Sequence, residues 1–156
     1  MYLAVGTHPD IAYAVGVLSR FNSCAGPQHW RAVQRVFQYL CGTSDLALEY
    51  GPSSFGSHLT GYSDADHGGD VDSGQSTNGY AFFIGSSCVN WSSKWQTVVA
   101  RSTTEAEYIA SNHAGAEAIW LRQFLQELGY PPTGPTTIYT DNQSAIAVAK
   151  NPEHHG

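Results

Sequence analysis

The segment from about Thr103 to Leu128 constrains the fold most, because its apolar residues recur at intervals of three and four. This spacing predicts one long amphipathic helix that Gly129 and Pro131 end, with Gly115 as a place where it would break. A stripe that passes from small to large side chains predicts that the helix packs closely on a sheet. The stripe begins at Glu107 and continues through Ala110, Ala114, Ala118, Leu121, Leu125 and Leu128.

Strand-like segments lie on both sides of this helix. Three of them precede it, joined by short turns rich in glycine, serine and aspartate, which predicts an antiparallel meander. A fourth strand and a short helix at 142–150 follow it. Strands first, then helix, strand and helix, indicate an α/β fold with a mixed sheet. The predicted strands are 59–64, 79–84, 88–95 and 136–140.

Residues 1–50 show a different, mainly helical pattern. We predict a short helix that Thr7 or Asp10 caps, then a longer helix over 27–42 that begins with a proline and ends at a glycine. A short strand is predicted at 46–50, and a stretch rich in glycine, serine and proline follows as a linker. The predicted division is therefore a helical part at 1–50, a linker at 51–57 and an α/β domain at 58–156.

Composition excludes several classes of protein. A hydrophobic content of 42% with 12% aromatic residues indicates a folded chain. The net charge of −6 does not suggest a surface for nucleic acid, unless bound cations reverse the charge locally. The 3 cysteines are far apart, which argues against a disulfide framework and favours an intracellular, reducing setting. Apolar runs stay well short of the about 20 residues that a membrane span needs, so we predict no membrane partner.

Two short sequences repeat one pattern of tyrosine, hydroxyl residue and aspartate. They are Tyr62-Ser-Asp64 and Tyr139-Thr-Asp141, and each ends a predicted strand. The two-residue period of a strand places tyrosine and aspartate on one face. If these strands are parallel neighbours, both aspartates emerge at the same edge of the sheet. Alternatively, each aspartate caps the turn or helix that follows it, and spacing alone leaves both interpretations open.

Glu107 is the third carboxylate of interest. It stands at the N-terminal end of the apolar stripe, whereas Glu105 is two residues away and faces elsewhere. A carboxylate directed at a packed surface is costly unless it is paired or binds a metal. Three converging carboxylates also repel one another, a conflict that Mg²⁺ with oxygen ligands resolves. Two such ions can clamp the attacking water and the leaving oxygen of a phosphodiester.

Other patterns carry less chemistry. The aspartate-rich turn at 66–74 lacks the register of a calcium loop, so solvated turn carboxylates are the better interpretation. His113 and Glu117 have helical spacing, but one pair alone favours an ordinary surface or core contact over a zinc site. The chain contains no G-x-S-x-G motif, so serine–histidine–aspartate catalysis has no support.

Several motifs follow one another in a fixed order along nearly the whole chain. They are Gly6-Thr-His-Pro-Asp10, Tyr39-Leu-Cys-Gly-Thr43, Gly61-Tyr-Ser-Asp-Ala-Asp66, Ser76-Thr-Asn-Gly-Tyr80, Trp91-Ser-Ser-Lys94, Ser102-Thr-Thr-Glu-Ala-Glu-Tyr108 and Tyr139-Thr-Asp-Asn-Gln-Ser-Ala145. In this order they resemble a Ty1/copia-type retrotransposon polyprotein, across the end of its reverse transcriptase and its RNase H domain. The resemblance implies an RNase H-like mixed sheet, with three antiparallel strands, then a parallel strand, and flanking helices. Residues 1–50 would be the thumb- or connection-like tail of the reverse transcriptase.

The resemblance also implies a function. It points to an endonuclease that cuts the RNA strand of RNA–DNA hybrids by a two-metal-ion mechanism during reverse transcription. Asp64, Glu107 and Asp141 would be its catalytic ligands for two Mg²⁺ ions, with Mn²⁺ as a substitute, and we expect Asn142 or Ser144 to orient the substrate. The implied partners are the hybrid and the rest of the polyprotein, including reverse transcriptase and integrase. The implied setting is the cytoplasm, or a virus-like particle if the element is intact.

Two departures from the family pattern bear on activity. His67 stands where the family usually has tryptophan. Relatives also continue into a basic, histidine-containing segment whose further acidic residue completes the metal site, and we expect this RNase H-like domain to lack that C-terminal end. A second metal would then be held weakly. The alternative function is a non-catalytic truncated or domesticated remnant that folds and binds nucleic acid without cutting it.

Overall fold

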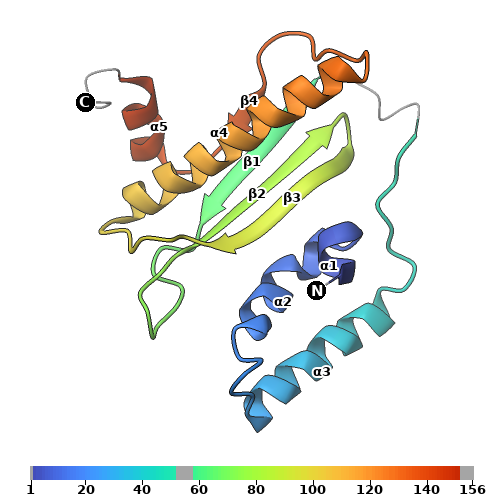
Figure 1. Ribbon diagram of the computed structural model, residues 1–156, viewed down its shortest axis with the longest axis vertical. Coiled ribbons are helices and arrows are strands. Elements are labelled where there is room, and N and C mark those ends of the chain that lie inside the picture. The colour runs from blue at the N-terminus through green and yellow to red at the C-terminus, as the bar shows by residue number, and fades with distance from the viewer. Residues whose placement is uncertain (1, 52–57, 152–156) are drawn as a thin grey trace. The chain divides into compact units, whose positions relative to one another are not determined.

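The computed structural model describes residues 2–51 and 58–151, which form two compact units, Met1–Glu49 and Tyr50–Gly156 (Figure 1). Each unit is described by itself. The predicted linker at 51–57 falls outside the described residues except for Gly51, so the predicted domain limits stay a prediction. Among the helices of the described residues, none is both long enough and apolar enough to cross a membrane.

The first unit is helical. The long helix predicted over 27–42 is confirmed, with a proline in its first turn, whereas the predicted strand at 46–50 does not form. The predicted cap was also wrong: neither Thr7 nor Asp10 caps the short helix, and the Asp10 carboxylate instead accepts a hydrogen bond from the Tyr39 hydroxyl at 2.6 Å. Tyr39, in the long helix over 27–42, therefore occupies the Asp10 carboxylate that would otherwise have capped the short helix. The elements are α1 (Tyr2–Gly6), η1 (Pro9–Ile11), α2 (Ala12–Ser19) and α3 (Pro27–Gly42).

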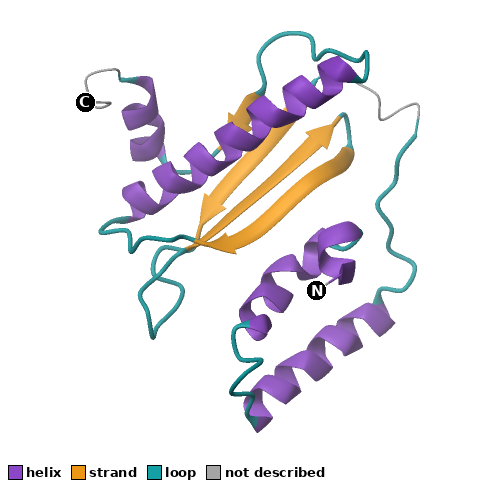
Figure 2. Ribbon diagram, in the orientation of Figure 1, coloured by secondary structure: helices purple, strands orange, loops and turns teal. Residues whose placement is uncertain are grey.

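The second unit is a four-stranded sheet with the order β3-β2-β1-β4. The first three strands form the predicted antiparallel meander, and β4 pairs with β1 in parallel, which confirms an α/β fold with a mixed sheet. Helix α4 runs across one face of this sheet (Figure 2). The elements are β1 (Leu59–Ala65), β2 (Thr77–Ile84), β3 (Ser87–Trp95), α4 (Thr103–Glu127), β4 (Thr137–Tyr139) and α5 (Gln143–Lys150).

Helix α4 and the sheet share one hydrophobic core, and α4 is continuous through Gly115. Small side chains let the helix lie close to the strands, as the stripe predicted. Leu121 packs with Leu59, the first residue of β1, so the rest of α4 extends past the start of that strand. Leu128 is consequently 55% exposed, and its predicted burial was wrong. The buried stripe consists of Ala106, Glu107, Ala110, Ala114, Ala118 and Leu121.

Candidate metal centre

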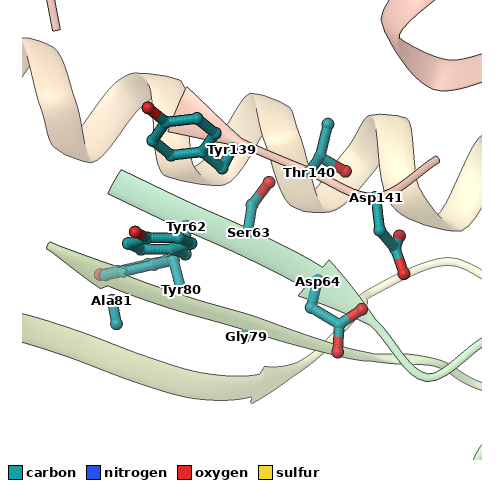
Figure 3. A pocket seen from close by; sticks show the side chains of 9 residues that line it. All are labelled: Tyr62, Ser63, Asp64, Gly79, Tyr80, Ala81, Tyr139, Thr140 and Asp141. Carbon is teal, nitrogen blue, oxygen red and sulfur yellow. The ribbon is translucent and has the colours of Figure 1, made fainter. Parts of the chain in front are cut away.

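The register between β1 and β4 determines where two of the carboxylates lie. Tyr62 pairs with Tyr139 across the parallel strands, and their rings stack with centroids 5.2 Å apart. Counting two residues onward from each tyrosine leads to Asp64 and Asp141, which therefore leave the sheet at the same edge. Figure 3 shows the two tyrosines and the two aspartates in this arrangement. The repeated sequence pattern thus corresponds to a repeated position in the structure.

Glu107 approaches the same edge from the first turns of α4, and it is only 6% exposed. The backbone N–H of Ala65 donates to its Oε1 at 3.3 Å, and the Thr140 hydroxyl donates to its Oε2 at 3.4 Å. One carboxylate oxygen is thus directed to the end of β1 and the other to the segment after β4. As a result, one oxygen each from Asp64, Glu107 and Asp141 lies within 4.8 Å of the others.

The start of α4 explains why Glu107, and not Glu105, takes part. Ser102 is the N-cap, and its hydroxyl accepts a hydrogen bond from the Glu105 backbone N–H at 3.1 Å. The Glu105 carboxylate reaches back to accept from the Arg101 N–H at 2.8 Å. Glu105 therefore stabilises the helix terminus by satisfying backbone donors, and Glu107, two residues later, is turned toward the sheet, as the sequence predicted.

Electrostatics at this edge favour a cation. Burial raises the pKa of Glu107, and the negative charges of Asp64 and Asp141 raise it further, while the bonds from Ala65 and Thr140 act in the opposite direction. The adjoining open cleft has a volume of about 550 Å³, and none of its lining residues carries a positive charge. The lining consists of Tyr62, Ser63, Asp64, Gly79, Tyr80, Ala81, Tyr139, Thr140 and Asp141 (Figure 3).

The three residues fit a divalent metal. Carboxylate oxygens are the ligands that Mg²⁺ prefers, and opposite ligands around one such ion are roughly 4 Å apart. The 4.8 Å span of the three oxygens is close to that figure, and the exposed Asp64 and Asp141 can adjust. Within residues 2–51 and 58–151, this is the one group of three or more acidic, histidine or cysteine side chains that could hold an ion.

Asn142 and Ser144, the predicted substrate contacts, begin α5 beside Asp141. The Asn142 side chain is the N-cap and accepts from the Ala145 N–H at 2.8 Å, so Asp141 does not cap this helix. That result removes the alternative interpretation of Asp141. Ser144 is exposed in the first turn. Substrate binding by either residue stays a prediction.

The weaker sequence patterns have structural uses. In the aspartate-rich turn, Asp66 accepts from the Thr77 N–H and Asp70 accepts from the Ser73 N–H at 2.9 Å, so both carboxylates hold the turn. Glu117 accepts from the Asn90 side-chain amide at 2.8 Å, which ties α4 to β3. The Glu117 contact is the ordinary surface or core contact that the sequence favours, whereas Asp66 and Asp70 are partly buried and bonded within the turn rather than solvated.

The two groups that orient Glu107, the Ala65 N–H and the Thr140 hydroxyl, were not predicted from the sequence. The Ala65 N–H leaves no trace in a sequence, because it becomes a partner only when α4 is placed against β1. Thr140 did leave a signal, since a hydroxyl residue stands between tyrosine and aspartate in both repeated patterns. The other such hydroxyl, Ser63, lies 3.3 Å from the hydroxyl of Ser111 in α4. Both hydroxyls therefore face the helix.

The fold and the site define an α/β domain with a carboxylate cluster at one sheet edge, and comparison with known proteins shows similarity to retrotransposon polyproteins. The chain is 48% identical over 155 residues to the retrovirus-related Pol polyprotein from transposon TNT 1-94 of Nicotiana tabacum, an alignment of 99% of this chain and 11% of that protein. It is 42% identical over 156 residues to the corresponding polyprotein from transposon RE2 of Arabidopsis thaliana, covering 99% and 10%. The chain thus spans about a tenth of these polyproteins.

A third relative is much shorter. The chain is 51% identical over 121 residues to the secreted RxLR effector protein 161 of Plasmopara viticola, covering 78% of this chain and 84% of that protein. No family model matches the chain, and no solved structure is significantly similar to it. The similarity to Pol polyproteins over almost the whole chain supports its being a fragment of a retrotransposon polyprotein.

Proposed function

We propose that this segment is the ribonuclease H region of a retrotransposon Pol polyprotein, with an RNase H-like fold. It would cut the RNA strand of RNA–DNA hybrids during reverse transcription, leaving 3′-hydroxyl and 5′-phosphate ends. The observation that carries the proposal is the convergence of Asp64, Glu107 and Asp141 from β1, α4 and the end of β4. The similarity to Pol polyproteins supports a nucleic-acid substrate for that cluster.

The three carboxylates would hold two Mg²⁺ ions, for which Mn²⁺ would substitute. Bound ions of this kind supply an activated water and stabilise the charge on the leaving oxygen. Asp64 and Asp141, both exposed, present their oxygens to the cleft, whereas the buried Glu107 is oriented by Ala65 and Thr140. Ionisation of Glu107 is needed for metal binding, and a cation between the three groups would favour that ionised form against the burial and the repulsion that raise its pKa.

The substrate would be recognised by its shape. RNA–DNA helices are read largely through backbone geometry and 2′-hydroxyls, which requires no base-reading motif. Asn142 follows Asp141 directly and Ser144 lies in the first turn of α5, and these residues would orient the substrate. In an intact element, the remaining parts of the polyprotein, including reverse transcriptase and integrase, would be partners, and the setting would be the cytoplasm or a virus-like particle.

The proposal is tested by cleavage of a 5′-labelled RNA–DNA hybrid in Mg²⁺ or Mn²⁺. Asp64→Asn should reduce the cleavage rate by more than about a hundredfold, which exceeds the usual effect of losing an outer-shell partner. Glu105→Gln is the matched control, since it removes a carboxylate of the same helix that faces away from the site. Chelation with EDTA should abolish cleavage by the wild type.

Two results would contradict the proposal. Equal cleavage by wild type and Asp64→Asn, unaffected by EDTA, would show that the carboxylate cluster is not the nuclease site. Hybrid binding without any cleavage in either metal would favour the alternative function, a non-catalytic remnant. A binding assay on the same hybrid, in parallel with the cleavage assay, separates these outcomes.

A further inference from the structure

A buried pair of amides lies beside the first turns of α4. Gln96 directly follows β3 and is 1% exposed, and Asn78 in β2 is 3% exposed. The Gln96 side chain donates from Nε2 to Asn78 Oδ1 at 2.6 Å and to the Ala106 carbonyl oxygen at 2.9 Å. Its backbone N–H donates to the Ser76 carbonyl oxygen at 2.8 Å. Gln96 is thus fixed through both its main chain and its side chain.

These contacts determine which way both amides point. The Ala106 carbonyl can only accept, so the nitrogen of the Gln96 amide must face it. The same nitrogen bonds to Asn78, so the Asn78 oxygen must face Gln96. Within the described residues, this leaves Asn78 Nδ2 and Gln96 Oε1 buried without a hydrogen-bond partner. Buried polar atoms without partners cost stability, so an apolar pair of similar shape would fold at least as well.

Gln96 and Asn78 contact the backbone on both sides of the hydrogen bond between Ala65 and Glu107. Ala106, which Gln96 holds, is the residue immediately before Glu107 in α4. Asn78 is paired across β1 and β2 with Ala65, and the Ala65 N–H is the group that bonds to Glu107. Gln96 therefore connects the backbone that carries the Glu107 side chain to the strands that carry its hydrogen-bond donor.

We propose that Gln96 is a positioning residue for the carboxylate cluster: by holding Ala106 against Asn78, it places the Glu107 carboxylate opposite Asp64 and Asp141. This inference rests on the proposed function for its purpose, but its geometric content does not depend on metal. Removing the Gln96 amide should let the first turns of α4 shift relative to β1, which weakens the bond between Ala65 and Glu107. Outer-shell partners that orient ligands typically change metal affinity by about 10- to 100-fold when removed.

The test compares Gln96→Met and the double variant Gln96→Met/Asn78→Leu with the wild-type chain. The double variant removes both atoms that lack partners, so it should fold at least as stably as the wild type. Asn90→Leu is the matched control, because the Asn90 amide also ties β3 to α4, but through Glu117, ten residues after Glu107. Thermal unfolding verifies that each variant is folded.

Two measurements test whether Gln96 positions Glu107. The first is hydrogen exchange of the Ala65 amide without metal, which should become about two- to tenfold faster in both Gln96 variants, the effect of losing one ordinary hydrogen bond. The second is Mn²⁺ affinity by calorimetry, which should fall at least about tenfold in both while Asn90→Leu keeps wild-type values. A double variant that is stable but still binds weakly shows positioning rather than loss of fold.

The outcomes separate this inference from the proposed function. A wild-type exchange rate at Ala65 in a folded Gln96 variant would overturn the positioning role, whatever the metal result. Wild-type Mn²⁺ affinity in the folded double variant would overturn it as well. If the wild type bound no Mn²⁺, the proposed nuclease would fail, and the Ala65 exchange rate would still support or overturn the placement of Glu107 by Gln96.

Discussion

At the scale of single residues, the three carboxylates have the same chemistry but different surroundings. Asp64 and Asp141 are exposed, whereas Glu107 is buried. Burial, together with the charges of Asp64 and Asp141, raises the pKa of Glu107, so the folded state holds that proton more tightly than the unfolded state does. Ionisation of Glu107 therefore destabilises the metal-free fold. The loss develops as the pH rises from the ordinary carboxyl pKa of about 4.3 through the raised folded value, and it persists above that value.

Glu107→Gln should accordingly stabilise the metal-free protein in a pH-dependent way. At pH 8 we expect a rise in Tm of roughly 2–4 °C, which corresponds to about 1 kcal/mol in a chain of this size. At pH 3.5, where Glu107 is protonated in both states, the gain should vanish. Thermal scans in EDTA at both pH values measure this difference, and an equal shift at the two pH values would contradict the electrostatic explanation.

Asn142 caps helix α5, and this role can be tested separately from its predicted substrate contact. Its side chain caps α5, so Asn142→Ala should cost about 1 kcal/mol, whereas Asn142→Ser should retain most of the cap. If the Asn142 amide also orients substrate, the serine variant should lose little stability but show a higher KM for the hybrid. Urea denaturation and steady-state kinetics test the two effects, and an unchanged KM would leave Asn142 with the cap alone.

Much of this residue-level arrangement could be predicted from the sequence, and the reason is periodicity. The two-residue period of strands places tyrosine and aspartate on one face, and the helical period separates Glu107 from Glu105. Spacing could not show that α5 is capped by Asn142 rather than by Asp141, since both residue types cap helices. Nor could it show the bonds from Ala65 and Thr140, because these depend on how α4 lies against the sheet.

At the scale of elements, Gly61 has no room for a side chain, whereas Gly115 has ample room. A side chain at Gly61 in β1 would collide with the ring of Phe82, which is fully buried, whereas Gly115 in α4 has open space around it. Gly61→Ala should therefore cost about 1–3 kcal/mol through overpacking. Gly115→Ala should gain about 0.5–1 kcal/mol, because alanine is the better helix former. Urea midpoints measured at a constant m-value test both signs, and a stabilising Gly61→Ala would show that β1 is packed less tightly than described.

Elements with a clear period were predicted well, and elements that depend on distant partners were not. The four strands and the long helix follow from alternation and from the three–four spacing, and their limits agree with the prediction within two residues. The segment 46–50 alternates in the same manner but has no strand partner among residues 2–51 and 58–151. The short α1 has too few residues to show a helical period, so it was not predicted.

At the scale of the whole molecule, a cluster of like charges links metal binding to stability. If the proposed site binds Mn²⁺, ligand at about 100 times Kd should add about 2.7 kcal/mol to the free energy of unfolding. In a chain of this size, that corresponds to a rise in Tm of roughly 5–10 °C. Thermal scans with Mn²⁺ and then with excess EDTA should show the rise and its reversal, and Asp64→Asn should show neither. A Tm unaffected by Mn²⁺ at every concentration would contradict a metal centre.

The stacked pair of Tyr62 and Tyr139 has a consequence for how such sequences can change in length. Because β4 is paired with β1 at this position, we expect the connection from Gly129 to Thr136 to gain or lose residues without moving Asp141. One residue inserted between Tyr139 and Asp141 would instead move that carboxylate away from Asp64 and Glu107. Insertions and deletions should therefore leave the carboxylate cluster intact on one side of Tyr139 and break it on the other, although the two positions are only a few residues apart.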